Sequence, residues 1–475
     1  MIQNTPSTSV IRIRTTLGEL GSVFQPGMKP VGQSRVVWLA GLFFVVGAAV
    51  VVGKEVADAN WLHLGVLVAV ILALQWPIEV ALGLYVFLVP FDSIAALGQG
   101  TSGTTVNWVL GAVAASALLG AGIFKKRIRW PSRSALWWAL FLGWGIASTA
   151  WALQPSITIQ FLSTATALVA LYLLAVSWQI NEKQLSVLTR FVIAGAFIAS
   201  CFVIYQYLGG VVYKSGLGVE TGRASLVLGN REANPNHLGT DLLLPFSLAM
   251  GWFLSARRKF EVFAAVIVAA AIAYTVFITM SRGSLLAVGV ILAIFLFRLG
   301  LQRRMLIFAP AFLLIAVSMP HTFFERLQTA VATGGAGRLG IWQVGLVLLK
   351  RYGGLGAGLA NFPVAYSDFA GHASSFVGYG RGAHDIYLEV GVELGIVGVL
   401  LMFAAFVSHF KALRALRAGR EPVSLKALAL ECACWATLVN GIFDGGVWYK
   451  SFWLTWMLAL MIVGLRPRAA VDHVR

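Results

Sequence analysis

The sequence predicts an all-α, polytopic integral membrane protein with about 12–14 transmembrane helices and a long loop on one side that carries short helices. Three observations predict this class. Of 475 residues, 59% are hydrophobic and only 12% are charged, whereas a soluble globular protein carries roughly 25% charged residues. The apolar residues form runs long enough to cross a bilayer. The basic residues gather in short clusters between these runs.

The apolar runs set the number of spans, because a spanning helix needs about 20 apolar residues. About fourteen runs approach that length. They are 36–53, 61–76, 78–96, 106–124, 135–150, 158–178, 185–208, 237–255, 261–280, 284–300, 305–319, 386–409, 427–446 and 451–465. An even number of spans leaves both termini on the same side.

The basic clusters predict which side is cytoplasmic. They fall on alternate connections, on the side of the N-terminus: Lys125 to Arg127, Arg257 to Lys259, Arg298 to Arg304, Lys411 to Lys426, and Arg466 with Arg468. We therefore expect cytoplasmic tails at 1–34 and 467–475, with spans in 35–319 and 386–466. These clusters also explain the formal charge of +17. No nucleic-acid motif accompanies it, so we expect no nucleic-acid partner.

Two long segments remain on the external side, 209–236 and 320–385. The second is much longer than an ordinary connection between helices, and such loops are usually functional. Within it, "GRLGIWQVGLVLLKRY" places apolar residues near helical spacing, which predicts a helix too short to span. The glycine-rich "GGLGAGLANF" that follows lets the backbone approach another segment closely.

Several site classes are excluded. Cys201, Cys432 and Cys434 lie in apolar runs without the spacing of a disulfide framework or a zinc site. The chain has no Walker loop, no HExxH and no GxSxG in a strand-turn-helix context. No DxD-like acidic pair suits a divalent ion on the external face, so a phosphate site there would depend on arginine. We expect neither metal nor cofactor.

Two external arginines are candidates for an anion site. Arg282 lies in "TMSRGSLL", a short break between two apolar helices with no acidic neighbour in sequence. It favours an anion, although snorkelling to headgroups or pairing with a distant carboxylate is the alternative. Arg338 follows "GGAG" at the start of the loop helix, where backbone amides also attract anions. An ion pair with Asp368 or Glu325 would explain Arg338 equally well.

The stretch "AHDIYLEVGVELG" places charged residues at the membrane edge. His384 follows a flexible "GRGA" and precedes Asp385, a candidate N-cap for the next helix. A histidine held there could remove a proton from a substrate, or it could simply be satisfied by the helix end. Glu393 sits between Gly391 and Gly395, a spacing more typical of close helix packing than of chemistry.

These motifs together resemble the O-antigen ligase family, whose wider superfamily includes O-antigen polymerases and protein O-oligosaccharyltransferases. "ANPNHLG", "SRG", "GRLGIW", "GLGAGLANF" and "AHDIYLEVGVELGIVG" occur in this order. The resemblance covers roughly residues 223–400. Family members often have asparagine after the loop histidine, where this chain has Asp385.

The resemblance implies a multi-pass glycosyltransferase of the bacterial inner (cytoplasmic) membrane, with its active site on the periplasmic face and a catalytic loop at 320–385. It would move O-antigen glycan from undecaprenyl pyrophosphate to the lipid A core, inverting the anomeric centre without metal or nucleotide. His384 matches the essential loop histidine, and Arg282 and Arg338 match the arginines that hold the pyrophosphate. We expect further substrate contacts, and contact with membrane lipids. The expected substrate-binding residues are Arg223, Asn236, Trp342, Arg381, Asp385 and Tyr387.

Two other functions stay open at this point. An O-antigen or exopolysaccharide polymerase of the same superfamily would use the same arginines and histidine. A transporter or flippase for a lipid-linked sugar belongs to another class. Such transporters often show inverted repeats with broken helices near mid-membrane. This sequence shows no such repeat, and its polar groups gather on one face.

Overall fold

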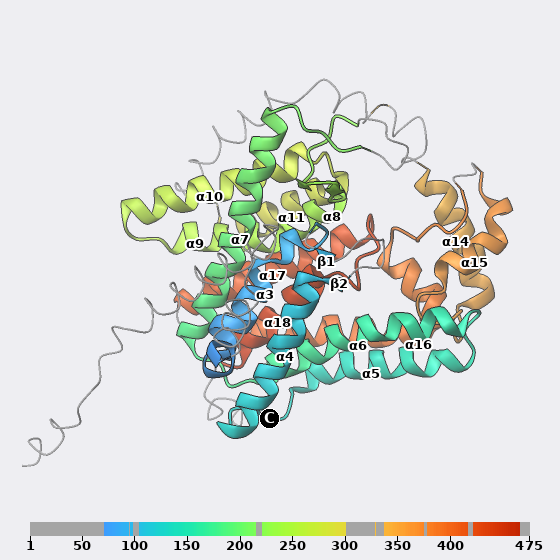
Figure 1. Ribbon diagram of the computed structural model, residues 1–475, viewed down its shortest axis with the longest axis horizontal. Helices are drawn as coiled ribbons and strands as arrows, with labels where there is room; N and C mark the ends of the chain where they lie inside the picture. Colours follow the sequence, from blue (N-terminus) through green and yellow to red (C-terminus); the bar gives the residue numbers. More distant parts are fainter. Residues whose placement is uncertain are drawn as a thin grey trace, which may run out of the picture. The chain divides into compact units, whose positions relative to one another are not determined.

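A computed structural model describes residues 71–94, 96–97, 104–214, 221–300, 328, 337–374, 378–416 and 421–465. All of them belong to the unit Val56–Arg475. They are mainly α-helical, with two short antiparallel strand pairs (Figure 1). The all-α class predicted from the sequence is confirmed.

The first half of the described chain runs from a π-helix to a long helix. The elements are η1 (Pro77–Leu82), α3 (Gly83–Phe87), η2 (Val89–Phe91), β1 (Ala96–Leu97), β2 (Thr104–Thr105), α4 (Val106–Phe124), α5 (Arg133–Ala147), η3 (Ser148–Ala150), α6 (Pro155–Ser177) and α7 (Glu182–Leu208).

The second half carries the site described below. Its elements are β3 (Val227–Leu228), β4 (Arg231–Glu232), α8 (Pro235–Asp241), α9 (Leu243–Ser255), α10 (Lys259–Ile278), α11 (Arg282–Leu299), α14 (Arg338–Tyr352), α15 (Phe362–Phe369), η5 (Ala370–His372), α16 (Ile386–Leu416), α17 (Glu421–Gly441) and α18 (Lys450–Val463). The predicted loop helix is therefore α14.

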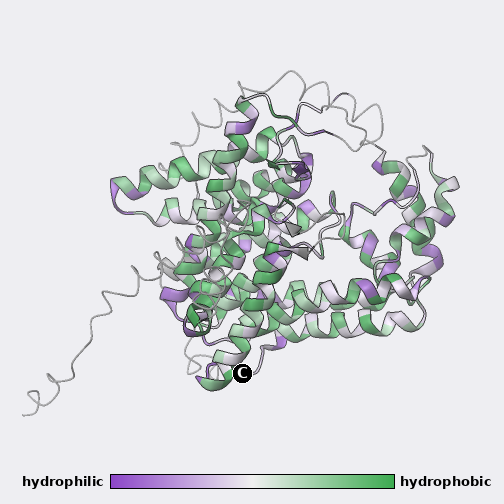
Figure 2. Cartoon of the chain, viewed as in Figure 1, coloured by the Kyte–Doolittle hydropathy of each residue, from purple (hydrophilic) through white to green (hydrophobic). Residues whose placement is uncertain are grey.

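Seven helices in the described part are long and apolar enough to cross a membrane, counting α8 and α9 as one run. The others are α4, α6, α7, α10, α11 and α16. Figure 2 shows hydrophobic residues along these helices and hydrophilic residues at many helix ends and on α14 and α15. The predicted spans 36–53 and 305–319, and most of 61–76, lie outside the described residues.

Other predicted spans are helical but shorter or interrupted. α5 has 15 residues and α18 has 14. The run predicted at 78–96 is divided among η1, α3 and η2, with Pro77 and Pro90 at the starts of η1 and η2. Proline lacks the amide that continues a helix, so it is accommodated at such starts. A hydropathy run does not reveal these breaks.

Small residues bring the helices around the site close together. α11 and α9 both pack on α17, and α5 packs along α16 and α6. A Cβ on Gly251 would lie 2.9 Å from the Ala429 Cβ, and one on Gly283 would lie 2.9 Å from the Asn440 Oδ1. These glycines therefore let α9 and α11 approach α17 without displacing it.

The start of α16 is interrupted at Gly395. Its φ of 62° and ψ of −164° are non-helical, in a region that is essentially restricted to glycine. The glycine-rich turn 353–362 fits into this break, since a Cβ on Gly395 would lie 2.2 Å from the Gly354 oxygen. The predicted close backbone approach of this turn is confirmed.

Glu393 supports the same junction. Its Oε2 accepts a hydrogen bond from the Ala360 amide at 2.8 Å and its Oε1 accepts one from the Phe362 amide at 3.0 Å. The Phe362 amide belongs to the first turn of α15, where a carboxylate is favourable. The partner that this carboxylate requires is therefore the loop backbone, which ties the loop to α16.

Candidate active site

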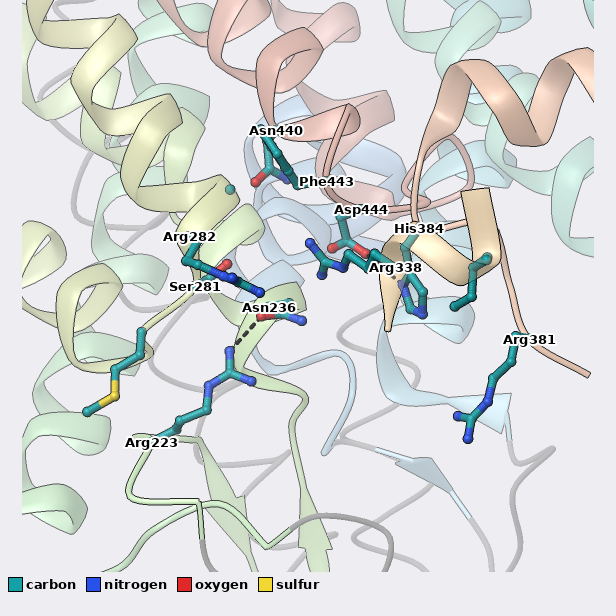
Figure 3. Close-up of a pocket in the computed structure, with 13 residues that line it drawn as sticks. Arg223, Asn236, Ser281, Arg282, Arg338, Arg381, His384, Asn440, Phe443 and Asp444 are labelled. Atoms are coloured by element: carbon teal, nitrogen blue, oxygen red, sulfur yellow. Dashed lines mark hydrogen bonds and ion pairs between the residues drawn. The ribbon is translucent and has the colours of Figure 1, made fainter. Parts of the chain in front are cut away.

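One polar cavity of about 290 Å³ gathers six of the nine predicted site residues. They come from α8, α11, α14 and the segments before α8 and α16 (Figure 3). The lining residues are Arg223, Asn236, Met280, Ser281, Arg282, Gly283, Arg338, Ile341, Arg381, His384, Asn440, Phe443 and Asp444. Four arginines and a single carboxylate give these walls a strongly positive charge.

Arg282 is the first residue of α11 because the backbone turns sharply before it. Met280 adopts a φ of 51°, in the left-handed region that a non-glycine residue seldom occupies. Ser281 is the N-cap, yet no described side chain caps the first amides of this helix. The predicted break between two apolar helices is thus a turn that presents Arg282 and free helix amides at the cavity.

Arg338 occupies the equivalent position on α14. Gly337, with a φ of 82°, is its N-cap, and within the described residues no side chain caps this helix either. The half-buried Arg338 guanidinium makes no ion pair in the described part of the chain, so the predicted pairing with Asp368 is not found. Glu325 lies outside the described residues.

Charge and burial act together on Arg338. Burial lowers the pKa of its guanidinium, the nearby charge of Asp444 raises it in part, and Arg282 lowers it further. Arginine nevertheless stays protonated in proteins. An anion bound beside Arg338 would offset the repulsion from Arg282 and stabilise the charged guanidinium.

The two helix starts thus form one candidate anion site. Each supplies backbone amides that no described side chain caps and the positive end of a helix dipole, and each carries an arginine at its first helical position. In Figure 3 the side chains of Arg223, Arg282 and Arg338 converge toward the middle of the pocket, whereas Arg381 lies to one side. This arrangement is suited to a phosphate group.

Two hydrogen bonds hold the Arg223 side chain in the cavity wall. The residue is only 7% exposed. Its Nε donates to the Thr279 oxygen at 2.7 Å, and its Nη2 donates to Asn236 Oδ1. Asn236 lies in the first turn of α8, which is capped by the side chain of Asn234. Arg223 and Asn236 were both predicted to bind substrate, and their hydrogen bond makes them one rigid unit in the cavity wall.

His384 faces the carboxylate of Asp444. The His384 Nδ1 lies 4.0 Å from Asp444 Oδ1, which is an ion-pair distance and longer than a hydrogen bond. His384 has a φ of 50°, an uncommon backbone conformation that often marks functional sites. Its side chain stays 43% exposed, so the ring is accessible from the cavity.

Asp444 is held in place by neighbours on three segments. The Tyr449 hydroxyl donates to its Oδ1 at 3.3 Å, and the Thr240 hydroxyl contacts its Oδ2 at 3.5 Å. Burial raises the pKa of Asp444, but the contact with His384 and the charges of His237 and Arg338 outweigh it and hold that pKa below its usual value. Asp444 is therefore a carboxylate at neutral pH.

Three predicted site residues do not line the cavity. Asp385 Oδ1 accepts hydrogen bonds from the Tyr387 and Leu388 amides, at 2.8 and 2.9 Å, which makes it the predicted cap of α16. The Tyr387 hydroxyl donates to the Leu438 oxygen at 2.9 Å. Trp342 Nε1 donates to the Ala383 oxygen at 3.1 Å. All three hold the backbone on either side of His384.

Sequence reasoning did not predict two polar residues of the cavity lining, Asn440 and Asp444. Asn440 contacts both Ser284 (3.3 Å) and Thr240 (2.8 Å), and it lies in an apolar run where an amide is costly without partners. That cost is the signal that could have found it. Asp444 was not among the predicted site residues. The nearby Lys450 does not compensate its charge, since Lys450 pairs with Asp92.

No group of three or more His, Cys, Asp or Glu side chains suited to a metal ion occurs among the residues that the structure describes. The polar side chains that line the cavity are four arginines, two asparagines, one serine, one histidine and one carboxylate.

Comparison with known proteins identifies the segment that carries these groups. Residues 265–403 match a family model described as O-Antigen ligase. The match includes Arg282, Arg338, Arg381 and His384, while Arg223 and Asn236 precede it and Asp444 follows it. A search of the curated proteins found no match. Residues 265–403 of this multi-pass membrane protein are therefore similar to the O-antigen ligase family, whose ligases and polymerases are glycosyltransferase-like enzymes.

Proposed function

We propose that this protein is an O-antigen ligase, which transfers a glycan from undecaprenyl pyrophosphate to the lipid A core in lipopolysaccharide biosynthesis. The observation that carries the proposal is one cavity in which Arg282 and Arg338 face the pair His384 and Asp444. Each arginine begins a helix whose first amides no described side chain caps. Cationic helix starts suit a pyrophosphate, and a histidine beside a carboxylate suits removal of a proton.

The arginines act on the leaving group. In the reaction the bond from the anomeric carbon to the phosphate oxygen breaks, and the electron pair remains on the pyrophosphate. Arg282 and Arg338 and the amides of their helices neutralise the charge that develops there. Loss of one such preorganised donor typically costs about 10²–10³ in kcat. Arg223, fixed by Asn236 and the Thr279 oxygen, extends the same positive wall.

His384 acts on the acceptor. As the acceptor oxygen forms its bond to the anomeric carbon, its proton passes to His384, and Asp444 stabilises the resulting imidazolium. Because Nδ1 faces Asp444, Nε2 is the nitrogen available to the hydroxyl. The 4.0 Å separation would shorten as the imidazolium forms, since catalytic contacts are often long before substrate binds. A single displacement of this kind inverts the anomeric centre.

The same proposal places the cavity at the periplasmic face of the inner membrane. The polyprenyl chain would then lie among the apolar spans beside α11. Transfer without a divalent metal is part of this proposal, because arginines supply the charge that a metal would otherwise provide.

The decisive experiment reconstitutes the purified protein in liposomes with undecaprenyl pyrophosphate-linked glycan and lipid A core, with and without EDTA. Glycan should appear on the core in both conditions. The variants His384→Ala and Arg282→Ala should abolish it, whereas Arg351→Ala, an exposed arginine at the other end of α14, should not. Glycan that lengthens only on the carrier would identify a polymerase. Carrier crossing the membrane without transfer would identify a transporter.

A further inference from the structure

A second cavity, of about 450 Å³, adjoins the active-site cavity. Its walls include Asp92, Trp108, His237, Asp241, Trp448 and Tyr449. Tyr449 and His237 form the partition between the two cavities. The Tyr449 hydroxyl contacts His237 Nε2 on one side and Asp444 Oδ1, a residue of the first cavity, on the other.

The charge of the second cavity is unlike that of the first. Lys450 is the one cation with a permanent charge among its described lining residues, and it is already engaged by Asp92 and by the Thr105 hydroxyl at 3.0 Å. Asp241 also lines the wall. The described walls hold no arginine, and the one lysine is paired with Asp92, so they offer a phosphate no uncompensated positive charge. The ligand is therefore not the pyrophosphate.

The remaining walls suit a hydroxyl-rich ring. Trp448 is fixed against Phe141, Phe161 and Trp453, at centroid distances of 5.9, 5.6 and 6.1 Å, and Trp108 remains 46% exposed. Aromatic faces pack against apolar C–H groups, while carboxyl groups form hydrogen bonds with hydroxyls. The hydroxyls of Ser163 and Thr164 complete this mixed lining.

We propose that the second cavity is a subsite for a sugar ring next to the reacting carbon, supplied by either the donor glycan or the acceptor. Its volume lies within the roughly 300–1,000 Å³ of small-molecule sites. Trp108 and Trp448 provide the stacking faces, and the Asp241 carboxyl forms hydrogen bonds with the sugar hydroxyls. The partition of Tyr449 and His237 places this ring beside His384 and Asp444. This inference rests on the proposed glycosyl transfer.

Binding is tested first, without any reaction. The full-length protein in a detergent without a sugar headgroup is studied by saturation-transfer difference NMR, with methyl glycosides of glucose, galactose and N-acetylglucosamine as probes. At least one glycoside should receive saturation from the wild-type protein. Trp108→Ala, Asp241→Asn and the cavity-filling Ser163→Phe should remove that signal, and Trp108→Phe should retain it because it keeps an aromatic face. Trp130→Ala, 84% exposed and outside both cavities, is the matched control.

Kinetics then identify the source of the sugar. In the reconstituted transfer assay, Asp241→Asn should raise one KM by up to about tenfold, as loss of a hydrogen bond predicts. A raised KM for the acceptor assigns the subsite to the acceptor sugar, and a raised KM for the donor assigns it to the donor glycan. If no glycoside binds, or if the variants bind as wild type does, the subsite is wrong even where transfer proceeds. If sugars bind but no transfer occurs, the proposed function fails and the subsite stands.

Discussion

At the scale of single residues, the pair His384 and Asp444 joins two segments that are 60 positions apart and face each other across 4.0 Å. The sequence identified His384 because a titratable ring before an N-cap at a membrane edge is unusual. It gave no comparable reason for Asp444, which ends an apolar run beside two glycines and resembles an ordinary turn residue. The partner of a catalytic group is set by tertiary contacts, and these leave no local pattern.

We expect Asp444→Asn to weaken transfer. Without the carboxylate charge, the cation that forms on His384 as it takes the acceptor proton is less stabilised, so the chemical step should slow. The loss in kcat should be up to roughly 10²-fold, within the 10²–10⁴ typical of general-base help. Steady-state kinetics in the reconstituted assay measure this loss, and an unchanged kcat would remove Asp444 from the mechanism.

Asp444 should also link stability to pH. Its pKa is held below the ordinary value, so its ionised form stabilises the fold above the unfolded pKa of about 3.9, and this contribution is lost as pH falls through the lower folded value. We therefore expect a smaller acid-induced drop in melting temperature for Asp444→Asn than for wild type between pH 5 and pH 3. Thermal scans in detergent at several pH values measure this difference. Equal drops in the two proteins would contradict it.

Substitutions of Arg338 test whether transfer needs the geometry of the guanidinium or only its positive charge. A lysine keeps the charge but loses the fork that holds two oxygens at once. Arg338→Lys should therefore retain part of the activity and raise KM for the lipid-linked donor, whereas Arg338→Ala should lose about 10²–10³ in kcat. Steady-state kinetics with the donor varied separate these outcomes. Equal activity of Arg338→Lys and the wild-type protein would show that the positive charge alone is sufficient at this position.

At the scale of elements, the helices were predictable and their interruptions were not. The short helix α14 and the start of α16 were predicted from apolar spacing and from the candidate cap Asp385. The break at Gly395 was not, because apolar residues continue on both sides of it. The Gly391 and Gly395 spacing suggested helix packing alone. The actual reason for Gly395 is a left-handed backbone that admits the loop at Gly354.

We expect Gly395→Ala to destabilise the protein by more than about 2 kcal/mol, because an alanine there adopts an unfavourable backbone conformation and its Cβ would lie 2.2 Å from the Gly354 oxygen. Gly289→Ala in α11 is the matched control, since a Cβ there meets no atom within 4 Å. That control should be neutral or stabilising by up to about 1 kcal/mol. Denaturation in detergent compares the two. Equal stabilities would mean that the α16 break is not a constraint.

At the scale of the whole molecule, the predicted membrane class followed from composition and hydropathy alone, but the cavity did not. Arg223, Arg282, Arg338, His384 and Asp444 span more than 200 positions, and each lies at the end of a helix or in a turn. The sequence predicted all of these as site residues except Asp444, but each one separately. Only the packing of α8, α11 and α17, with α14 placed beside them, brings them to one point.

This construction predicts that a small anion should stabilise the entire fold. Pyrophosphate that bridges the starts of α11 and α14 binds only when both are in place, so it should raise the unfolding free energy by RT ln(1 + [L]/Kd), about 2.7 kcal/mol at one hundred times Kd. Thermal unfolding of the purified protein with increasing inorganic pyrophosphate measures this effect. Arg282→Ala and Arg338→Ala should each remove most of the shift, and Arg351→Ala should preserve it. A shift that survives loss of both site arginines, or one that equal ionic strength of chloride reproduces, would mean that the anion acts through general screening and that the two helix starts do not form a pyrophosphate site.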